Sequence, residues 1–125
     1  HRMKLLHNYV SLGTVSLIAE AAACAQSAGV DASTFVDVLS RGGGWGAALD
    51  RLKPYLLSGD PGGLRFSISN AHKDLSYYSQ MAADSLADST IARAVTQTLG
   101  QAASKAGPQA LVPEMVTMIA QRKPR

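Results

Sequence analysis

The stretch KLLHNYVSLGTVSLIAEAAACAQSA, residues 4–28, decides the fold. Its apolar side chains recur at steps of three and four residues, which is the period of an α-helix. They are so numerous that the apolar stripe is wide, and we therefore expect a helix that is buried on most sides. Gly29 follows directly, and a glycine just past the last turn is a common helix stop.

Such a helix is long for a chain of 125 residues. At about 1.5 Å per residue it extends over roughly 37 Å, whereas a compact domain of this length has a radius of gyration of about 14 Å. The helix is therefore expected to cross the whole domain, and its start should project toward something else.

Further helical segments follow, separated by loop signals. No alternating, β-branched run competes with them, so the sequence predicts a single all-α domain of about six helices with no internal repeat. The expected helices are one capped by Asp31 and broken at residues 41–44, one from Ala47 to Leu57 with Pro54 as a kink or boundary, one from about Ser67 to Leu86, one capped by Asp88 or Ser89 and ending near Gly107, and a short one with Pro113 in its first turn.

The composition disfavours several classes of protein. Hydrophobic residues make up 46% and charged residues 17% of the chain, which is the balance of a packed domain and not of a disordered segment. Aromatic residues are only 6%, too few for a platform on which single-stranded nucleic acid stacks. The net charge is a modest +3, and its densest run, Arg122, Lys123 and Arg125, is interpreted as a solvated end. We therefore expect no nucleic acid as a partner.

The chain holds one cysteine, Cys24, and cannot form an intrachain disulfide. A reducing compartment is the simplest interpretation, so we expect a cytoplasmic protein. No apolar stretch approaches the ~20 residues that cross a bilayer, and no membrane is expected as a partner. The chain starts at His1 in a helical pattern without a signal peptide, which we interpret as a fragment whose upstream part has been removed.

Three kinds of site are disfavoured. The glycine-rich residues 42–46 lack the preceding strand and the following Lys-Ser/Thr of a phosphate-binding loop, so a helix connector is favoured. His7 and His72 lie far apart with no carboxylate or cysteine at ligand spacing, so no metal site is expected. Cys24 lies on a stripe of small residues with no neighbouring histidine, which favours a packed residue over a nucleophile.

Two pairs of polar residues remain as candidates. Lys4 and Asn8 are four residues apart, so both project from one face of the first helix near its start. A lysine and an amide there can hold one carbonyl oxygen between them, with the ammonium donating a proton. Lys73 and Asp74 lie in the expected fourth helix, after Phe66. Spacing alone favours exposed surface groups for both pairs.

The segment KLLHN, residues 4–8, resembles the lysine-x-x-asparagine-asparagine segment that opens the C-terminal domain of β-hydroxyacid dehydrogenases. This family includes 3-hydroxyisobutyrate dehydrogenase and tartronate semialdehyde reductase, and it is related to 6-phosphogluconate dehydrogenase. The resemblance extends to about Gly107 through AEA at 19–21, AGVD at 28–31, VLS at 38–40, Pro54, Phe66 and KDL at 73–75.

The resemblance implies a two-domain enzyme. Residues 1–125 would form a C-terminal helical domain, similar to that of 6-phosphogluconate dehydrogenase, which contributes to the substrate site and forms a homodimer. An N-terminal Rossmann domain, absent from this chain, would bind most of NAD or NADP. The activity implied is hydride transfer between this cofactor and a small 3-hydroxy acid or its semialdehyde. The chain alone should then be inactive, since it has no strand–glycine-turn–helix unit.

The resemblance also assigns roles to individual residues. Lys4 matches the general acid/base at the substrate oxygen, and Asn8 matches the asparagine that orients the substrate. His7, beside it, is expected at the substrate too. Phe66 and Lys73 match residues that approach the nicotinamide. An ammonium suits its place because hydride addition to a carbonyl leaves an alkoxide, which needs positive charge and a proton.

Four places depart from the family pattern. His7 replaces the first of the paired asparagines, and Gly46 stands near the place of a common serine. Residues 88–91 lack a usual proline, and residues 107–111 lack a typical aspartate-containing motif. These departures indicate an outlying member. Lys4 nevertheless favours hydroxyacid chemistry over the related imine reductases, in which this lysine is commonly replaced.

A second hypothesis is a non-catalytic helical module for dimerisation or binding. The first helix is apolar and rich in small residues, so it can pack against a copy of itself and bury a large area. The two hypotheses differ in what replacement of Lys4 does. Loss of turnover with the dimer retained supports an enzyme, whereas unchanged turnover supports the module.

Overall fold

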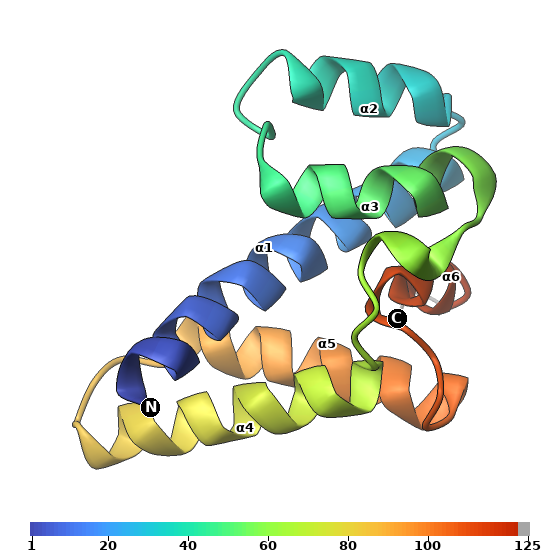
Figure 1. Cartoon of the computed structure of the whole chain (residues 1–125). Helices are drawn as coiled ribbons and strands as arrows, with labels where there is room; N and C mark the ends of the chain where they lie inside the picture. The colour runs from blue at the N-terminus through green and yellow to red at the C-terminus, as the bar shows by residue number, and fades with distance from the viewer. Residues whose placement is uncertain (123–125) are drawn as a thin grey trace.

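The computed structural model describes residues 1–122, and it confirms the predicted all-α class. Figure 1 shows its six α-helices, and no strand is present within these residues. Two single-turn 3-10 helices, η1 and η2, lie in the connections. The elements are α1 (Arg2–Ser27), α2 (Ala32–Ser40), α3 (Ala47–Ser58), η1 (Pro61–Gly63), α4 (Ile68–Asp84), α5 (Thr90–Ala106), η2 (Val112–Glu114) and α6 (Met115–Ala120).

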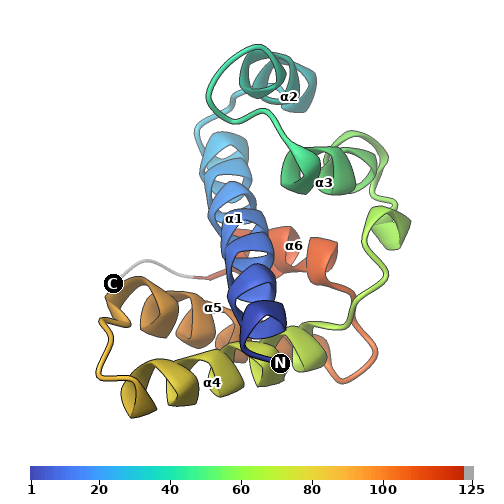
Figure 2. The ribbon, with the colours of Figure 1, turned by 60° about the vertical axis from the view of Figure 1, so that its left-hand side comes forward.

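The long helix α1 runs through the molecule and contacts nearly every other element. Its N-terminal half lies over the antiparallel pair α4 and α5, as Figures 1 and 2 show from two sides. Its C-terminal half contacts α2 and α3, and the short helix α6 packs against it as well. The N-terminus of α1 thus lies beside α4, far from α2 and α3.

The core lies where α1 meets α3, α4, α5 and α6. It is built from aliphatic side chains and alanines, because small residues let helix backbones approach closely. The fully buried members include Val15, Leu49, Leu52, Ile68, Leu75, Leu99, Val112 and Met115.

The prediction that α1 is buried on most sides is wrong. Leu12, Val15 and Ala19 face the core, but Val10 and Leu17 are 64% and 65% exposed. Cys24, expected to be packed, is exposed as well. The sequence shows only that apolar residues occur on all sides of the helix. In the structure, the other helices pack against one side of α1. An apolar face therefore remains open.

Most of the expected helix ends are confirmed, with local differences. Asp31 caps α2 by accepting from the Thr34 backbone N–H, and Ser67 caps α4 by accepting from that of Asn70. Helix α3 continues past Pro54 to Ser58, so Pro54 is not a boundary.

Three other helix ends differ from expectation. Helix α4 ends at Asp84, and Leu86 follows it with φ 56° and 95% exposure. Ser89 precedes α5 but makes no capping bond with its side chain. Pro113 lies in η2 and not in the first turn of α6.

Two further expectations concern the ends and the surface of the chain. Lys123 and Arg125 of the expected basic run lie outside the described residues. None of the described helices is long and apolar enough to cross a membrane.

Candidate functional site

The candidate site is built where α1 crosses α4. Asn8 of α1 donates from Nδ2 to Oδ2 of Asp74 on α4 at 3.1 Å, and both side chains are partly buried. The next residue, Tyr9, stacks on Tyr78 of α4 with ring centroids 4.2 Å apart and planes at 23°. Asp74 and Tyr78 are one helical turn apart, so the two contacts fix the position of α1 along α4.

Both rings of the aromatic stack are partly buried. Burial is the main cause that raises the pKa of Tyr9 above its usual value of 10.0, followed by the charges of Tyr78 and Asp88. Tyr9 therefore stays a neutral phenol at neutral pH and does not compete for a proton at the site.

The Asn8 amide is oriented from both of its ends. Its Oδ1 lies 3.0 Å from Nδ1 of His7, which donates when that nitrogen carries the proton. Its Nδ2 carries two hydrogens, and the bond to Asp74 uses one of them. The second N–H has no partner among residues 1–122 and can donate to a ligand oxygen, so Asn8 is a pre-oriented donor.

Lys4 lies one helical turn before Asn8, about 6 Å along the axis of α1. Its side chain is exposed, and it forms no ion pair with any described residue. Lys73, beside Asp74 on α4, is likewise exposed and unpaired in this part of the chain. Neither ammonium is neutralised internally, so both remain available to a ligand.

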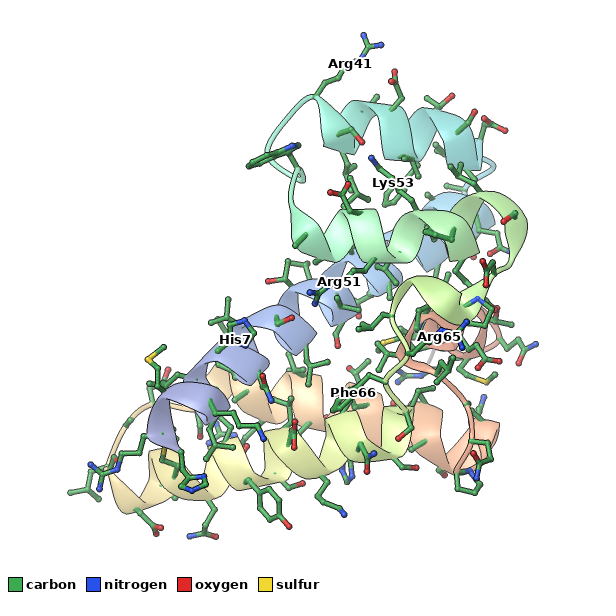
Figure 3. All side chains as sticks on the ribbon, viewed as in Figure 1. His7, Arg41, Arg51, Lys53, Arg65 and Phe66 are labelled. Atoms are coloured by element: carbon green, nitrogen blue, oxygen red, sulfur yellow. The ribbon has the colours of Figure 1, made fainter. Side chains whose placement is uncertain are left out.

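Phe66 is positioned by a short backbone pairing just before α4. The Phe66 carbonyl accepts from the Val112 backbone N–H at 2.8 Å, and the Ile68 N–H donates to the Ala110 carbonyl at 2.9 Å. These bonds flank the isolated bridge between Ser67 and Leu111. The ring is half-buried against the core, and Figure 3 shows it between α1 and α4. An aromatic side chain held in this way can contact a flat ligand ring.

Two arginines on this side of the molecule lack a carboxylate partner. Figure 3 shows Arg51 on α3 and Arg65 beside Phe66, and no described acidic group pairs with either. The other labelled cations are neutralised: Arg41 pairs with Asp37 at 3.2 Å, and Lys53 pairs with Asp50 at 3.1 Å. The surface near Phe66 therefore favours anionic ligands.

The structure brings together only some of the sequence-predicted residues. His7 and Asn8 form one hydrogen-bonded group with Asp74, and Lys4 lies a turn away on the same helix. Phe66 lies two residues before α4, and the first residue of that helix, Ile68, is about 9 Å along the helix axis from Asp74. A ligand must therefore be extended along α4 to reach both ends.

Sequence reasoning missed the part that Asp74 plays. The residue stands out in the KDL segment at 73–75, but nothing in the local pattern pairs it with Asn8, which lies 66 residues away. A carboxylate on the apolar, α1-facing side of α4 is the signal that could have indicated a buried partner.

Gly46 precedes α3 at φ 147°, a backbone conformation that side chains strain. A serine at this position would therefore be strained in the backbone conformation that Gly46 adopts. Gly46 lies in the loop between α2 and α3, whereas Lys4 and Asn8 lie on α1.

The described residues form an all-α domain whose long first helix carries an exposed lysine one turn before a hydrogen-bonded asparagine. A family model described as the NAD-binding domain of NADP-dependent 3-hydroxyisobutyrate dehydrogenase matches residues 1–119, and the chain belongs to this family. The family is one of NAD(P)-dependent oxidoreductases. No curated protein matches the chain.

Proposed function

We propose that the chain is the C-terminal domain of an enzyme that transfers a hydride between NAD or NADP and a small 3-hydroxy acid or its semialdehyde. The observation that carries the proposal is the unpaired Lys4 ammonium one turn from Asn8, which Asp74 holds in place. Family membership supplies the oxidoreductase class.

Lys4 moves the proton in this reaction. The nicotinamide, when bound, supplies the hydride to the carbonyl carbon or takes it from the carbinol carbon. In reduction the developing alkoxide takes a proton from the Lys4 ammonium, and in oxidation the neutral amine takes the hydroxyl proton. The positive charge of Lys4 beside this oxygen lowers the barrier in both directions, because negative charge develops on the oxygen in the transition state.

Asn8 orients the substrate for this step. Its free N–H donates to a substrate oxygen, while Asp74 and His7 hold the amide plane. A pre-oriented donor loses little entropy on binding and so contributes to positioning as well as to affinity. His7 is exposed, and its second ring nitrogen can contact the substrate.

Phe66 and Lys73 are assigned to the cofactor. The half-buried Phe66 ring is suited to pack on the flat nicotinamide, and Lys73 supplies an exposed cation on α4. Residues 1–122 hold no strand followed by a glycine turn, so most of the cofactor would bind to a separate N-terminal Rossmann domain. That domain would determine whether the enzyme uses NAD or NADP, and the chain alone would be inactive.

The test is turnover of the full-length enzyme with Lys4→Ala. We expect the turnover number for 3-hydroxy acids, followed by nicotinamide absorbance, to fall by about 10² to 10⁴-fold. Lys105→Ala, which removes an exposed lysine from the last turn of α5, is the matched control and should leave turnover unchanged. Equal turnover in the two variants would overturn the proposal.

A second candidate function is a non-catalytic dimerisation module, and the open apolar face of α1 favours it. It is compatible with an enzyme, because a homodimer can also be catalytic, and we include a cytoplasmic homodimer in the proposal. The candidates separate in the Lys4→Ala variant. If the chain is a non-catalytic module, Lys4→Ala should leave the dehydrogenase activity of the full-length protein unchanged.

A further inference from the structure

The α4–α5 groove, which lies between these two helices, is polar. The helices run side by side (Figures 1 and 2), and the groove has a volume of about 660 Å³. Arg93 carries a charge in its wall, His72 can carry a second, and no carboxylate lines it within residues 1–122. Apart from Gly100, the other residues that line it bear hydroxyls or amides. Such a concave surface favours a ligand with negative charge and several hydrogen-bonding groups.

The α4–α5 groove lies on the side of α4 that faces away from the candidate site. Asp74 and Tyr78 contact α1, whereas His72 and Ser76 line the groove. Successive residues of a helix are about 100° apart around its axis, so His72 and Asp74 are separated by about 200°. A ligand in the groove therefore does not compete with a substrate for Asn8.

Gly100 makes room for the imidazole of His72 in this groove. A Cβ at Gly100 would lie 3.0 Å from Nε2 of His72, which is too close for the ring to stay in place. Gly100 lies inside α5, where glycine is less favourable than alanine. The only side-chain hydrogen bond at His72 goes from Ser76 to its backbone carbonyl. Within the described residues, the ring nitrogens of His72 are therefore available to a ligand.

Two polar atoms of residues in the groove wall are buried and unsatisfied. Oγ of Ser79 and Oε1 of Gln101 are shielded from solvent and form no hydrogen bond with any of residues 1–122. Buried polar atoms are normally hydrogen-bonded, so each such exception needs an explanation. A change of side-chain rotamer can present either group to the groove. A ligand hydroxyl both donates and accepts, so it can satisfy the Ser79 hydroxyl as well as the Gln101 carbonyl.

Arg93 supplies the positive charge near one end of the groove. It forms no ion pair with a described carboxylate, and one of its N–H groups donates to Oγ of Ser89 at 3.4 Å. The pKa of the nearby Asp88 carboxyl is lowered mainly by the hydrogen bond from Thr90 and only slightly by the charge of Arg93. Asp88 therefore does not neutralise Arg93. The guanidinium keeps most of its donors for an anion, which it can bind through two parallel hydrogen bonds.

We propose that the α4–α5 groove binds a small anion with several hydroxyl groups, such as a sugar that bears one phosphate or carboxylate. Arg93 binds the anionic group, and His72 binds a hydroxyl at the other end. Arg93 and Gly100, on which His72 lies, are about 10 Å apart along α5, which suits the length of a hexose derivative. Ser79 and Gln101 bind hydroxyls between these ends. The site uses neither Lys4 nor Asn8, so it goes beyond the proposed function.

Isothermal titration calorimetry of the full-length protein without cofactor tests the ligand class. Glucose 6-phosphate, glucuronate and glucose share a ring and differ at one carbon, which carries a phosphate, a carboxylate or a neutral hydroxyl. At least one of the two anions should bind with a Kd about tenfold or more below that of glucose. Whichever anion binds more tightly identifies the anionic group.

Cyclohexanecarboxylate tests the need for hydroxyls, because it has a ring and a carboxylate but no hydroxyl. It should bind about tenfold more weakly than the tighter of the two sugar anions. The proposal is overturned if neither sugar anion binds, if glucose binds as tightly as both, or if cyclohexanecarboxylate binds as tightly as the sugar anions.

Substitution of Arg93 shows where the anion binds. Arg93→Gln removes the charge and should weaken binding of the preferred anion by about tenfold or more. Arg41→Gln is the matched control, since Arg41 is exposed on another helix end and pairs with Asp37, and it should leave binding unchanged. Lys4→Ala should leave binding unchanged as well. Loss of binding in Lys4→Ala but not in Arg93→Gln would place the anion at the candidate substrate site and overturn the proposal.

Two further variants separate a binding site from a defect of packing. Gly100→Ala displaces the His72 ring and should weaken anion binding, while circular dichroism should show a folded protein because alanine favours the helix. Ser79→Ala removes an unsatisfied hydroxyl, so it should raise the thermal midpoint of the unliganded protein and weaken anion binding. Anion binding as tight as that of the wild type in both variants would overturn the proposed site.

Discussion

Asn8 on α1 donates a hydrogen bond of 3.1 Å to Asp74 on α4, and this contact joins the two helices that carry the candidate site. A hydrogen bond to a charged acceptor is stronger than one between neutral groups. The second N–H of Asn8 has no partner within the described part of the chain, and the bond to Asp74 fixes its direction. Asp74 is therefore a positioning residue for Asn8.

Asp74→Ala should weaken both the fold and catalysis. The free energy of unfolding is expected to fall by about 1.5 kcal/mol, since a partly buried amide loses a charged acceptor. The turnover number should fall by about tenfold because Asn8 is no longer held. Asp84→Ala on the same helix is the control, since the Asp84 carboxylate only accepts from Gln80 one turn away. Equal effects of the two variants on turnover would remove the positioning role from Asp74.

Ser67→Ala should destabilise the start of α4. The Ser67 hydroxyl accepts from the Asn70 backbone N–H at 3.0 Å, and loss of such a cap costs about 1 kcal/mol. Chemical denaturation measures the change, and Ser67→Asp should largely restore stability because aspartate also caps. The expected loss is contradicted if alanine and aspartate give the same midpoint.

Gly63→Ala should be the most disruptive of the conservative changes. A Cβ at Gly63 would lie 2.2 Å from the Arg51 carbonyl oxygen, so η1 must move away from α3. Overpacking of this kind costs about 2 kcal/mol. Gly43→Ala is the matched control, because a Cβ there meets nothing within 4 Å. Urea midpoints that are equal for the two variants would show that η1 is not held against α3.

Acid should loosen α2 through Asp31. Its carboxylate accepts from the Ser33 hydroxyl and the Thr34 N–H, and these bonds lower its pKa below the usual 3.8. The folded state therefore binds the proton more weakly than the unfolded state. The stabilisation is present above 3.8 and is lost as the pH falls through the lowered folded pKa. Amide exchange at Thr34 should accelerate over this range.

Asp31→Asn isolates this effect from other carboxylates. Asparagine caps a helix about as well as aspartate but does not titrate near this pH. Exchange at Thr34 in this variant should lack the acid-dependent increase. An identical pH profile in the two proteins would mean that another group, such as Asp88, controls the acid response.

The helices were predictable from the sequence because their signals are local. The three- and four-residue period defines α1, and Asp31 marks the start of α2 as expected. The predicted helix from Ala47 to Leu57 is confirmed, and of the two alternatives for Pro54 the boundary is wrong, because α3 accommodates the missing N–H. The expected end of the fourth helix near Leu86 is two residues too late, because α4 ends at Asp84 and Leu86 lies exposed beyond it.

The candidate site was predictable only in part. The four-residue spacing of Lys4 and Asn8 places both on one side of α1, and the resemblance adds their roles. The contact of Asn8 with Asp74 depends on how α1 crosses α4, which no local pattern specifies. The open apolar face of α1 has the same cause, because an apolar residue that faces the core and one that faces solvent look alike in a sequence.

Chemical rescue of Lys4→Ala in the full-length enzyme tests the central claim most directly. If Lys4 transfers the proton, a small primary amine such as ethylamine should restore turnover to Lys4→Ala in proportion to its concentration. The same amine should restore nothing to Asp74→Ala, and Lys4→Arg should remain slow because a guanidinium hardly releases its proton. Full turnover of Lys4→Ala without any amine would contradict the account.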